Sequence, residues 1–236
     1  MGCLLYEDER FQQSSQCMLR PGGMDLTWEA VEMAGFQPGC TLLDAGCGLG
    51  TTVAQLSAQG FSASGLERSP ALLGRAKNSH PQLLFKQGDL CSIPWPDEYF
   101  EGVLCECSLS TVTQLPTALR EIHRVLMPHG VLAVSDFYQR EAFEPPRQME
   151  GSCLGGAVTA ETTRLLMRDH GFTQSGWQDA TEHLRTFTAS LVWNYGSLKK
   201  LHALLLSCEE EQAPSEVPWA LYGYAISSWE KVELHG

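Results

Sequence analysis

A glycine-rich turn, "DAGCGLG", is the feature that most constrains how this chain folds. A short apolar run ends at Asp44. Gly46, Gly48 and Gly50 follow, and a helical pattern begins directly after them. Glycines between a strand and a helix permit a tight turn and let a ligand approach the backbone closely. The first turn of the helix offers N–H groups that no helical carbonyl uses. The turn therefore predicts a strand–turn–helix unit that binds a polar ligand.

The central region alternates short apolar runs with helical patterns, which is typical of a parallel α/β sheet. We expect strands at residues 41–44, 63–67, 83–87, 103–106 and 131–136. Helices are expected between them, at residues 51–59, 70–78 and 116–126. Pro70 and Pro116 open two of these helices at a position where the missing N–H costs nothing, and Ser69 is suited to cap the first of the two.

The flanking segments add further elements. A helix is expected at residues 26–34, before a turn at Pro38-Gly39. After residue 140 the pattern predicts, in chain order, a helix at 160–170, a strand at 172–180, a helical stretch at 182–206 and a final strand at 222–232. No linker separates two independent units, so we expect a single domain.

The charge balance excludes several classes of partner. The chain has 16 basic and 28 acidic residues, a formal net charge of −12. Phosphate neutralisation needs clustered Lys and Arg, so we expect neither nucleic-acid binding nor binding to an anionic membrane surface. No apolar stretch reaches the roughly 18 residues that a membrane-spanning helix needs.

The cysteines and histidines bear on the compartment and on metals. Nine cysteines are too few for a disulfide scaffold at this length, and an odd number cannot all pair within the chain. The N-terminus places acidic residues where a secretion signal has basic ones. We therefore expect a reducing, cytoplasmic compartment. The seven histidines show no metal-binding spacing, so no metal site is expected.

The order of acid and glycines in the turn resembles motif I of the class I S-adenosylmethionine-dependent methyltransferases, D-x-G-x-G-x-G. A dinucleotide-binding turn has the different order G-x-G-x-x-G. Glu67 ends the second expected strand, where an acid can accept hydrogen bonds from both ribose hydroxyls. Asp89 matches the family's acid that binds the adenine amino group, and Leu90 matches the backbone amide beside it.

Two further segments match the family in the right order. Residues 100–103 resemble "FDxV", with Glu101 in place of Asp. Residues 118–138 resemble the family's "E-x-x-R-V-L-K-P-G-G" run, with His129 in place of the first glycine of the final pair. Residues Glu106 to Leu109 lie at the carboxyl edge of the fourth expected strand and should lie beside the cofactor.

The resemblance spans residues 41–138 and is greatest to the ubiquinone- and arsenite-methyltransferase branch. It implies a Rossmann-like fold with a seven-stranded, mostly parallel sheet and helical additions at both ends. Residues 1–40 would form a helical lid, 41–140 the cofactor-binding core, and 141–236 the substrate-side elements and last strands. It also implies S-adenosylmethionine as the cofactor, with S-adenosylhomocysteine as its product. The expected cofactor-binding residues are Arg20, Asp44, Gly46, Cys47, Gly48, Gly50, Glu67, Arg68, Asp89, Leu90, Glu106 and Leu109.

The acceptor side is less defined. In this family the acceptor attacks the sulfonium methyl in line, so positioning and desolvation matter more than one diagnostic catalytic residue. The segment "GSCLGGA" resembles a segment of the arsenite methyltransferases in which a Cys binds the metalloid, and Cys153 takes that place. Cys208 is the only later cysteine. Cys107, after the fourth strand, and Tyr138, beyond the fifth, are the other acceptor-side candidates.

Part of the N-terminal segment has the features of a lid over the site. Phe11 and the turn at residues 20–23, which begins with Arg20, would exclude water. Aromatic rings can also favour a sulfonium by cation–π contact. The aromatic residues in or near capping segments are Tyr6, Phe11, Trp28, Tyr138, Trp177 and Trp193, of which Trp28 and Trp193 are expected to pack in the core.

The acidic surface favours a small-molecule acceptor. Three alternatives stay open at this point. The first is a thiol-bound metalloid acceptor. The second is a nicotinamide-dependent oxidoreductase with an atypical glycine turn. The third is a cofactor-binding protein that serves as a non-catalytic partner. Neither the methylated atom, nor the use of a general base, nor the oligomeric state follows from the sequence.

Overall fold

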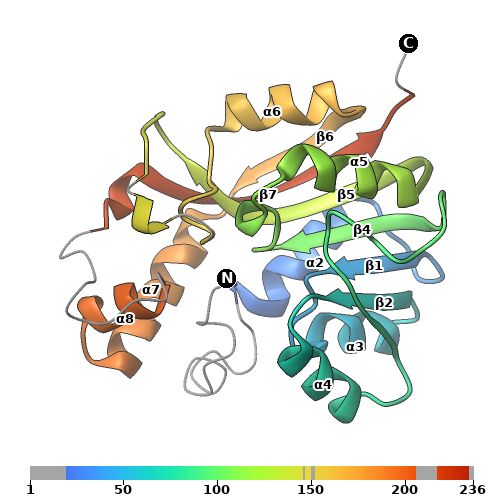
Figure 1. Cartoon of the computed structure of the whole chain (residues 1–236), viewed down its shortest axis with the longest axis horizontal. Coiled ribbons are helices and arrows are strands. Elements are labelled where there is room, and N and C mark those ends of the chain that lie inside the picture. Colours follow the sequence, from blue (N-terminus) through green and yellow to red (C-terminus); the bar gives the residue numbers. More distant parts are fainter. Residues whose placement is uncertain (1–19, 146, 150–151, 206–216, 234–236) are drawn as a thin grey trace.

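The computed structural model describes residues 20–145, 147–149, 152–205 and 217–233 (Figure 1). Tyr6, Phe11 and Cys208 lie outside these residues. Within the described ranges, no helix is both long enough and apolar enough to cross a membrane.

A seven-stranded sheet runs through the middle of the molecule, in the order β3-β2-β1-β4-β5-β7-β6 (Figure 1). Its strands are β1 (Thr41–Ala45), β2 (Ser62–Glu67), β3 (Leu84–Gln87), β4 (Phe100–Glu106), β5 (Leu126–Gln139), β6 (Phe172–Asp179) and β7 (Tyr222–Lys231). The first five pair in parallel, whereas β7 is antiparallel to both of its neighbours. The predicted mostly parallel sheet is confirmed.

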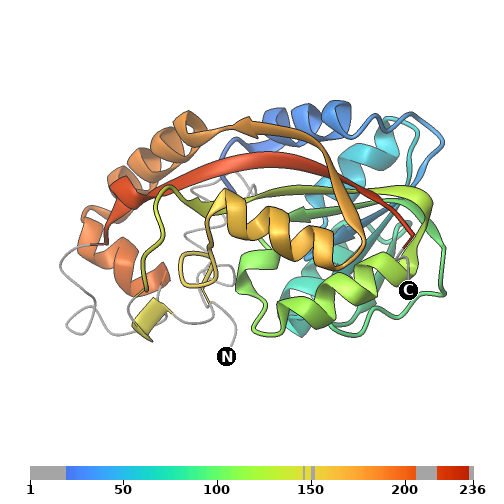
Figure 2. The same cartoon turned by 90° about the horizontal axis from the view of Figure 1, so that it is seen from above.

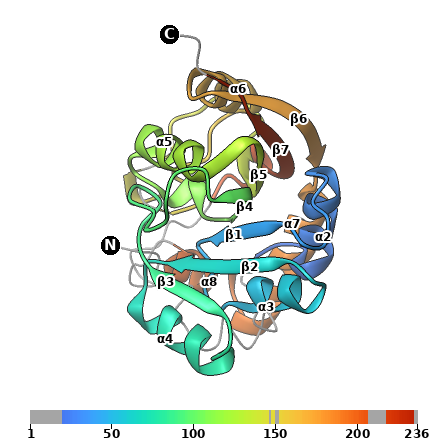
Figure 3. The ribbon, with the colours of Figure 1, turned by 90° about the vertical axis from the view of Figure 1, so that its right-hand side faces the viewer.

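Helices cover both faces of this sheet (Figure 3). One face carries α2 (Gly23–Met33), α3 (Thr51–Ala58) and α4 (Pro70–Ser79), and the other carries α5 (Leu115–Val125) and α6 (Ala160–Asp169). Successive strand side chains point to opposite faces, so in β1 Leu43 packs under α5 and Leu42 under α3. This burial on both faces explains why the parallel strands read as continuous apolar runs.

The helix boundaries follow local chemistry. The Ser69 hydroxyl accepts a hydrogen bond from the Leu72 amide at 3.3 Å, which confirms the predicted cap of α4. α5 ends at Val125, one residue earlier than expected. Leu126 is already extended there and pairs with Phe100, so β4 and β5 both begin earlier than the apolar runs indicated.

The C-terminal helical stretch differs from the prediction. It forms two helices, α7 (Thr181–Tyr195) and α8 (Leu198–Leu205), because Gly196 adopts a left-handed conformation with φ 79° and ends the first. Figure 2 shows both helices, in orange, at the end of the molecule where β7 begins and β5 ends. The expectation that Trp193 packs in the core is wrong, since 88% of it is exposed on α7.

Three short 3₁₀ turns complete the described chain: η2 (Leu109–Thr111), η3 (Arg147–Met149) and η4 (Trp219–Leu221). Within the expected lid, residues 1–40, the described part contains α2, which packs against the sheet. Its Leu26 and Ala30 lie against Tyr224 and Ile226 of β7.

Candidate cofactor site

A cleft of about 370 Å³ opens at the carboxyl ends of β1, β2 and β4. In an open parallel sheet this edge is where ligands bind, because loops diverge there on either side of a switch in strand order. The cofactor residues expected from the sequence line this cleft, with two exceptions. Leu109 is buried in the core under α5, and Gly50 lies behind the cleft wall.

The glycine turn is shaped by backbone conformations that other residues rarely adopt. Gly46 has φ 98°, and a Cβ there would lie 2.8 Å from Cβ of Ser108 on the opposite wall. Gly50 has φ 76° and caps α3, where a Cβ would lie 2.7 Å from the ring of Phe85. Gly46 therefore keeps the cleft open, whereas Gly50 lets α3 and β3 pack closely behind it.

Glu67, at the end of β2, holds the glycine turn in place. The Gly48 amide donates to its Oε2 at 2.9 Å, and the Ser69 amide donates to its Oε1 at 2.7 Å. The side chain is buried yet lines the cleft. A carboxylate has about four acceptor positions, so two backbone donors leave capacity for hydroxyl groups of a ligand.

A buried ion pair closes the inner end of the cleft. Nε of Arg20 lies 2.9 Å from Oε1 of Glu106, and the two side chains are only 10% and 6% exposed. Thr27 of α2 donates to Glu106 at 2.7 Å and also contacts Arg20. Nη2 of Arg20 donates to the hydroxyl of Thr52 in α3 at 3.0 Å. Three elements and the segment before α2 thus meet at one charged cluster.

Asp44, at the end of β1, lies beside this cluster and is 3% exposed. Burial raises its pKa to about 8, with the charges of Glu106 and Glu67 acting in the same direction and Arg20 in the opposite one. At the rim, Oδ1 of Asp89 accepts the amide of Cys91 at 2.8 Å, and Oδ2 lies 3.7 Å from Arg68.

Comparison with known proteins identifies the family. Residues 43–134 match a family model described as "Methyltransferase domain". The uncharacterized methyltransferase sll0829 of Synechocystis sp. is 31% identical over 160 residues, which are 65% of this chain and 74% of that protein. The chain is a class I S-adenosylmethionine-dependent methyltransferase. The nicotinamide interpretation of its glycine turn is thereby set aside.

Other relatives of this methyltransferase act on different acceptors. The demethylmenaquinone methyltransferase of Beutenbergia cavernae is 32% identical over 117 residues, 49% of this chain and 49% of the relative. The arsenite methyltransferase of Aquipseudomonas alcaligenes is 33% identical over 155 residues, 57% of this chain and 44% of the relative. The chain therefore spans about half the length of these two relatives.

The fold has a wider distribution than the reaction. The crystal structure of the [4+2]-cyclase SpnF superposes with a TM-score of 0.77 at 22% identity, over 97% of this chain and 93% of that one. This likeness concerns the fold alone, since one fold supports several chemistries.

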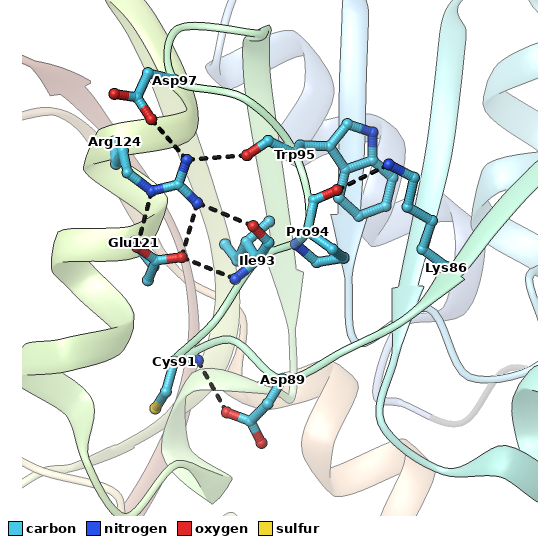
Figure 4. A network of polar contacts seen from close by, with 9 residues as sticks. All are labelled: Lys86, Asp89, Cys91, Ile93, Pro94, Trp95, Asp97, Glu121 and Arg124. Atoms are coloured by element: carbon cyan, nitrogen blue, oxygen red, sulfur yellow. Dashed lines mark hydrogen bonds and ion pairs between the residues drawn. The ribbon is translucent and has the colours of Figure 1, made fainter.

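The loop of the methyltransferase that carries Asp89 is fastened to α5 by Arg124 (Figure 4). The guanidinium donates to the carbonyls of Ile93 and Trp95, each at 2.9 Å, and to the Glu121 carboxylate at 2.8 Å. Oε2 of Glu121 in turn accepts the Ile93 amide at 2.8 Å. The Arg124 guanidinium holds the pKa of Glu121 below its usual range, so the pair stays ionised at neutral pH.

Replacing Arg124 by Ala is expected to loosen this loop. The free energy of unfolding should fall by about 1–3 kcal/mol, because two loop carbonyls and Glu121 lose a charged donor. The dissociation constant for S-adenosylmethionine should rise several-fold with it. Thermal denaturation and calorimetric titration check both values. Arg120→Ala, one turn earlier on the exposed side of α5, is the matched control, and equal melting temperatures for the two variants would contradict the expectation.

Of the acceptor-side candidates, only Cys107 lines the cleft. It has a left-handed φ of 52°, unusual for a residue other than glycine, and its Sγ lies 3.0 Å from the hydroxyl of Tyr224 on β7. Burial, and then the charge of Asp136, raises the pKa of this thiol well above its usual value, so the thiol is neutral. Cys105 packs on the opposite face of the sheet, so C-x-C is not a thiol pair.

The other two candidates lie away from the cleft lining. Cys153 is buried in an apolar cluster with Met149, Leu154 and Tyr222. The hydroxyl of Tyr138 donates to Asp179 near the beginning of α7.

Sequence reasoning missed Thr27, Thr52 and Tyr224. Thr52 lies two residues after Gly50, the last glycine of the turn, and could have been predicted from that position. Thr27 and Tyr224 are brought to the site only by tertiary packing.

Proposed function

We propose that this methyltransferase transfers the methyl group of S-adenosylmethionine to a small-molecule acceptor by in-line displacement. The observation that carries the proposal is the cleft itself. Along its edge, Asp89 follows β3, Glu67 ends β2, and the charged inner end lies at β1 and β4. Adenine, ribose and the amino-acid end follow one another in this same order in the cofactor.

Each part of the cofactor has candidate partners in the cleft. Glu67 would accept the ribose hydroxyls through the positions that Gly48 and Ser69 leave open. Asp89 and the amide of Leu90 would face the adenine. The amino-acid end would lie by Arg20, Glu106 and Asp44, where a guanidinium suits its carboxylate and the acids suit its ammonium and sulfonium groups.

The residues present fit this cofactor on independent grounds. Asp44 is a buried carboxyl turned into the cleft, which favours a cationic ligand. The absence of a side chain at Gly46 leaves room for a ligand against the turn. When bound, the cofactor supplies an electrophilic methyl group on sulfur. The protein's part is to hold both reactants in line and to exclude water, as the buried wall of Cys107 and Ser108 would do.

The small-molecule assignment is supported by the similarity to the demethylmenaquinone methyltransferase. A metalloid acceptor is the second candidate, because an arsenite methyltransferase is similar over 57% of this chain and because the thiol of Cys153 contributes to raising the pKa of Cys107. The first candidate is favoured, because metalloid binding needs thiolates and Cys107 is held as a neutral thiol. We also propose a reducing, cytoplasmic compartment, in which the described cysteines would stay free thiols.

A panel of acceptors tests this proposal. We expect release of S-adenosylhomocysteine with a phenol or quinol acceptor, and Cys153→Ser should retain that rate within about twofold since Cys153 does not line the cleft. Cys91→Ser is the matched control, because Cys91 is a partly exposed thiol in another loop. If arsenite with a thiol were the only substrate and Cys153→Ser abolished turnover, the metalloid alternative would replace the proposal.

A further inference from the structure

The inner part of the cleft contains more acidic than basic groups. Asp44 and Glu67 are buried there, the side chain of Glu106 is only 6% exposed, and Arg20 is the buried cation among the described lining residues. Arg68, the other lining arginine, is 58% exposed at the rim, near Asp89. Charges removed from water need partners of opposite sign. Arg20 can balance only one of the three acids, so a cationic ligand would supply the positive charge that is missing.

The three carboxylates differ in what holds them. Glu67 accepts two backbone amides, and Glu106 has Arg20, Thr27 and Thr52 around it. Asp44 accepts no hydrogen bond from any residue that the structure describes, although it is the most buried of the three. An ionised carboxylate is costly in such a place, so Asp44 is the group that takes up a proton when the cleft holds no added cation.

The other groups around Asp44 reinforce this assignment. Glu106 from β4 and Glu67 from β2 disfavour its charge, and Arg20 compensates for only part of their effect. The neighbouring thiols of Cys47 and Cys105 are themselves neutral, because burial raises the pKa of each. Glu106, Glu67 and Arg20 are the charged groups that act on the pKa of Asp44, which burial raises to about 8.

We propose that Asp44 is the residue by which this methyltransferase distinguishes the cationic methyl donor from its neutral product. With the sulfonium in the cleft, Asp44 is an ionised counter-charge. Methyl transfer forms the bond between acceptor and carbon, breaks the bond between sulfur and carbon, and leaves the electron pair on sulfur as a thioether. The acceptor gives up one proton in the same reaction, and Asp44 takes up one proton as the positive charge disappears, so that protons and charge balance.

The proposal has a measurable pH dependence. Below a pH of about 8, binding the donor requires Asp44 to lose its proton, whereas binding the product does not. The ratio of the dissociation constant for S-adenosylhomocysteine to that for S-adenosylmethionine should therefore increase about tenfold per pH unit up to about pH 8, and then level off. The two ligands share the same amino and carboxylate groups, so their own titration largely cancels in this ratio.

Calorimetric titration of both ligands from about pH 6 to about pH 9, without any acceptor, tests the proposal. In the wild type we expect the ratio of the two dissociation constants to increase with pH as described. Glu101→Gln, which removes a carboxylate at the far end of β4, should show the same increase, whereas in Asp44→Asn the ratio should not change with pH. In the wild type near pH 7, titrations in buffers of different ionisation enthalpy should show release of close to one proton with S-adenosylmethionine and close to none with S-adenosylhomocysteine. This second measurement does not depend on the folding of any variant.

A wild-type ratio that stays flat, or equal proton release with both ligands, would overturn the proposal. Because no acceptor is present, such a result would leave the proposed acceptor class untouched, and failure of the acceptor panel would leave the role of Asp44 untouched.

Discussion

The Glu67→Ala variant is expected to bind S-adenosylmethionine at least about 100-fold more weakly than the wild type. Hydrogen bonds to a charged group contribute about 1.5–3 kcal/mol each, and each 1.4 kcal/mol is a factor of ten in affinity. The substitution removes the carboxylate that faces the ribose. It also leaves the amides of Gly48 and Ser69 without their acceptor, so the glycine turn loses its position.

Calorimetric titration measures this loss directly. Glu67→Gln keeps the shape of the side chain and should lose less affinity than Glu67→Ala, because its one carbonyl oxygen can still accept one of the two amides. Glu101→Gln removes an acid that accepts the Thr41 amide at the opposite end of the sheet and should leave the affinity unchanged. An affinity of Glu67→Ala within about threefold of the wild type would show that the cofactor does not bind against β2.

The Arg20→Met variant should lower the free energy of unfolding by about 3–5 kcal/mol. Removing one partner of a buried ion pair leaves the other charge without compensation, and this costs more than the pair itself contributes. Glu106 would keep only the hydroxyls of Thr27 and Thr52. For a chain of this length the loss corresponds to a fall in melting temperature of roughly 6–20 °C.

A double-mutant cycle separates stability from binding in this cluster. Arg20→Met combined with Glu106→Leu removes both charges and should unfold near the wild-type temperature, because an apolar replacement of a buried pair is often neutral or stabilising. The same double variant should still bind S-adenosylmethionine more weakly than the wild type, since the groups proposed to meet the amino-acid end are gone. A double variant as unstable as Arg20→Met would show that Glu106 is not the group left uncompensated.

The central sheet could be predicted from the sequence because its signals are local. Apolar runs of strand length alternate with helices that have a proline in one of their first two positions, Pro70 in α4 and Pro116 in α5. The glycine turn has few possible conformations. The cleft lining followed from the same logic, because the carboxyl ends of neighbouring parallel strands meet at one edge.

The remaining parts depend on contacts between distant segments. Arg20 forms an ion pair with Glu106, and Cys107 contacts Tyr224, which lies 117 residues later in the chain. No local sequence pattern predicts either contact. The placement of Leu109 in the core was missed because η2 turns it under α5 directly after the cleft wall. The break at Gly196 did have a local signal, since glycine disfavours the interior of a helix.

A crystal structure of the protein with S-adenosylhomocysteine is the most direct test of the assignment of this cleft. We expect the ribose hydroxyls within hydrogen-bonding distance of Glu67, the adenine beside Asp89, and the amino-acid end against Arg20 and Glu106. Adenosine bound elsewhere on the molecule, or bound in the cleft with the adenine at the Arg20 end, would contradict the assignment.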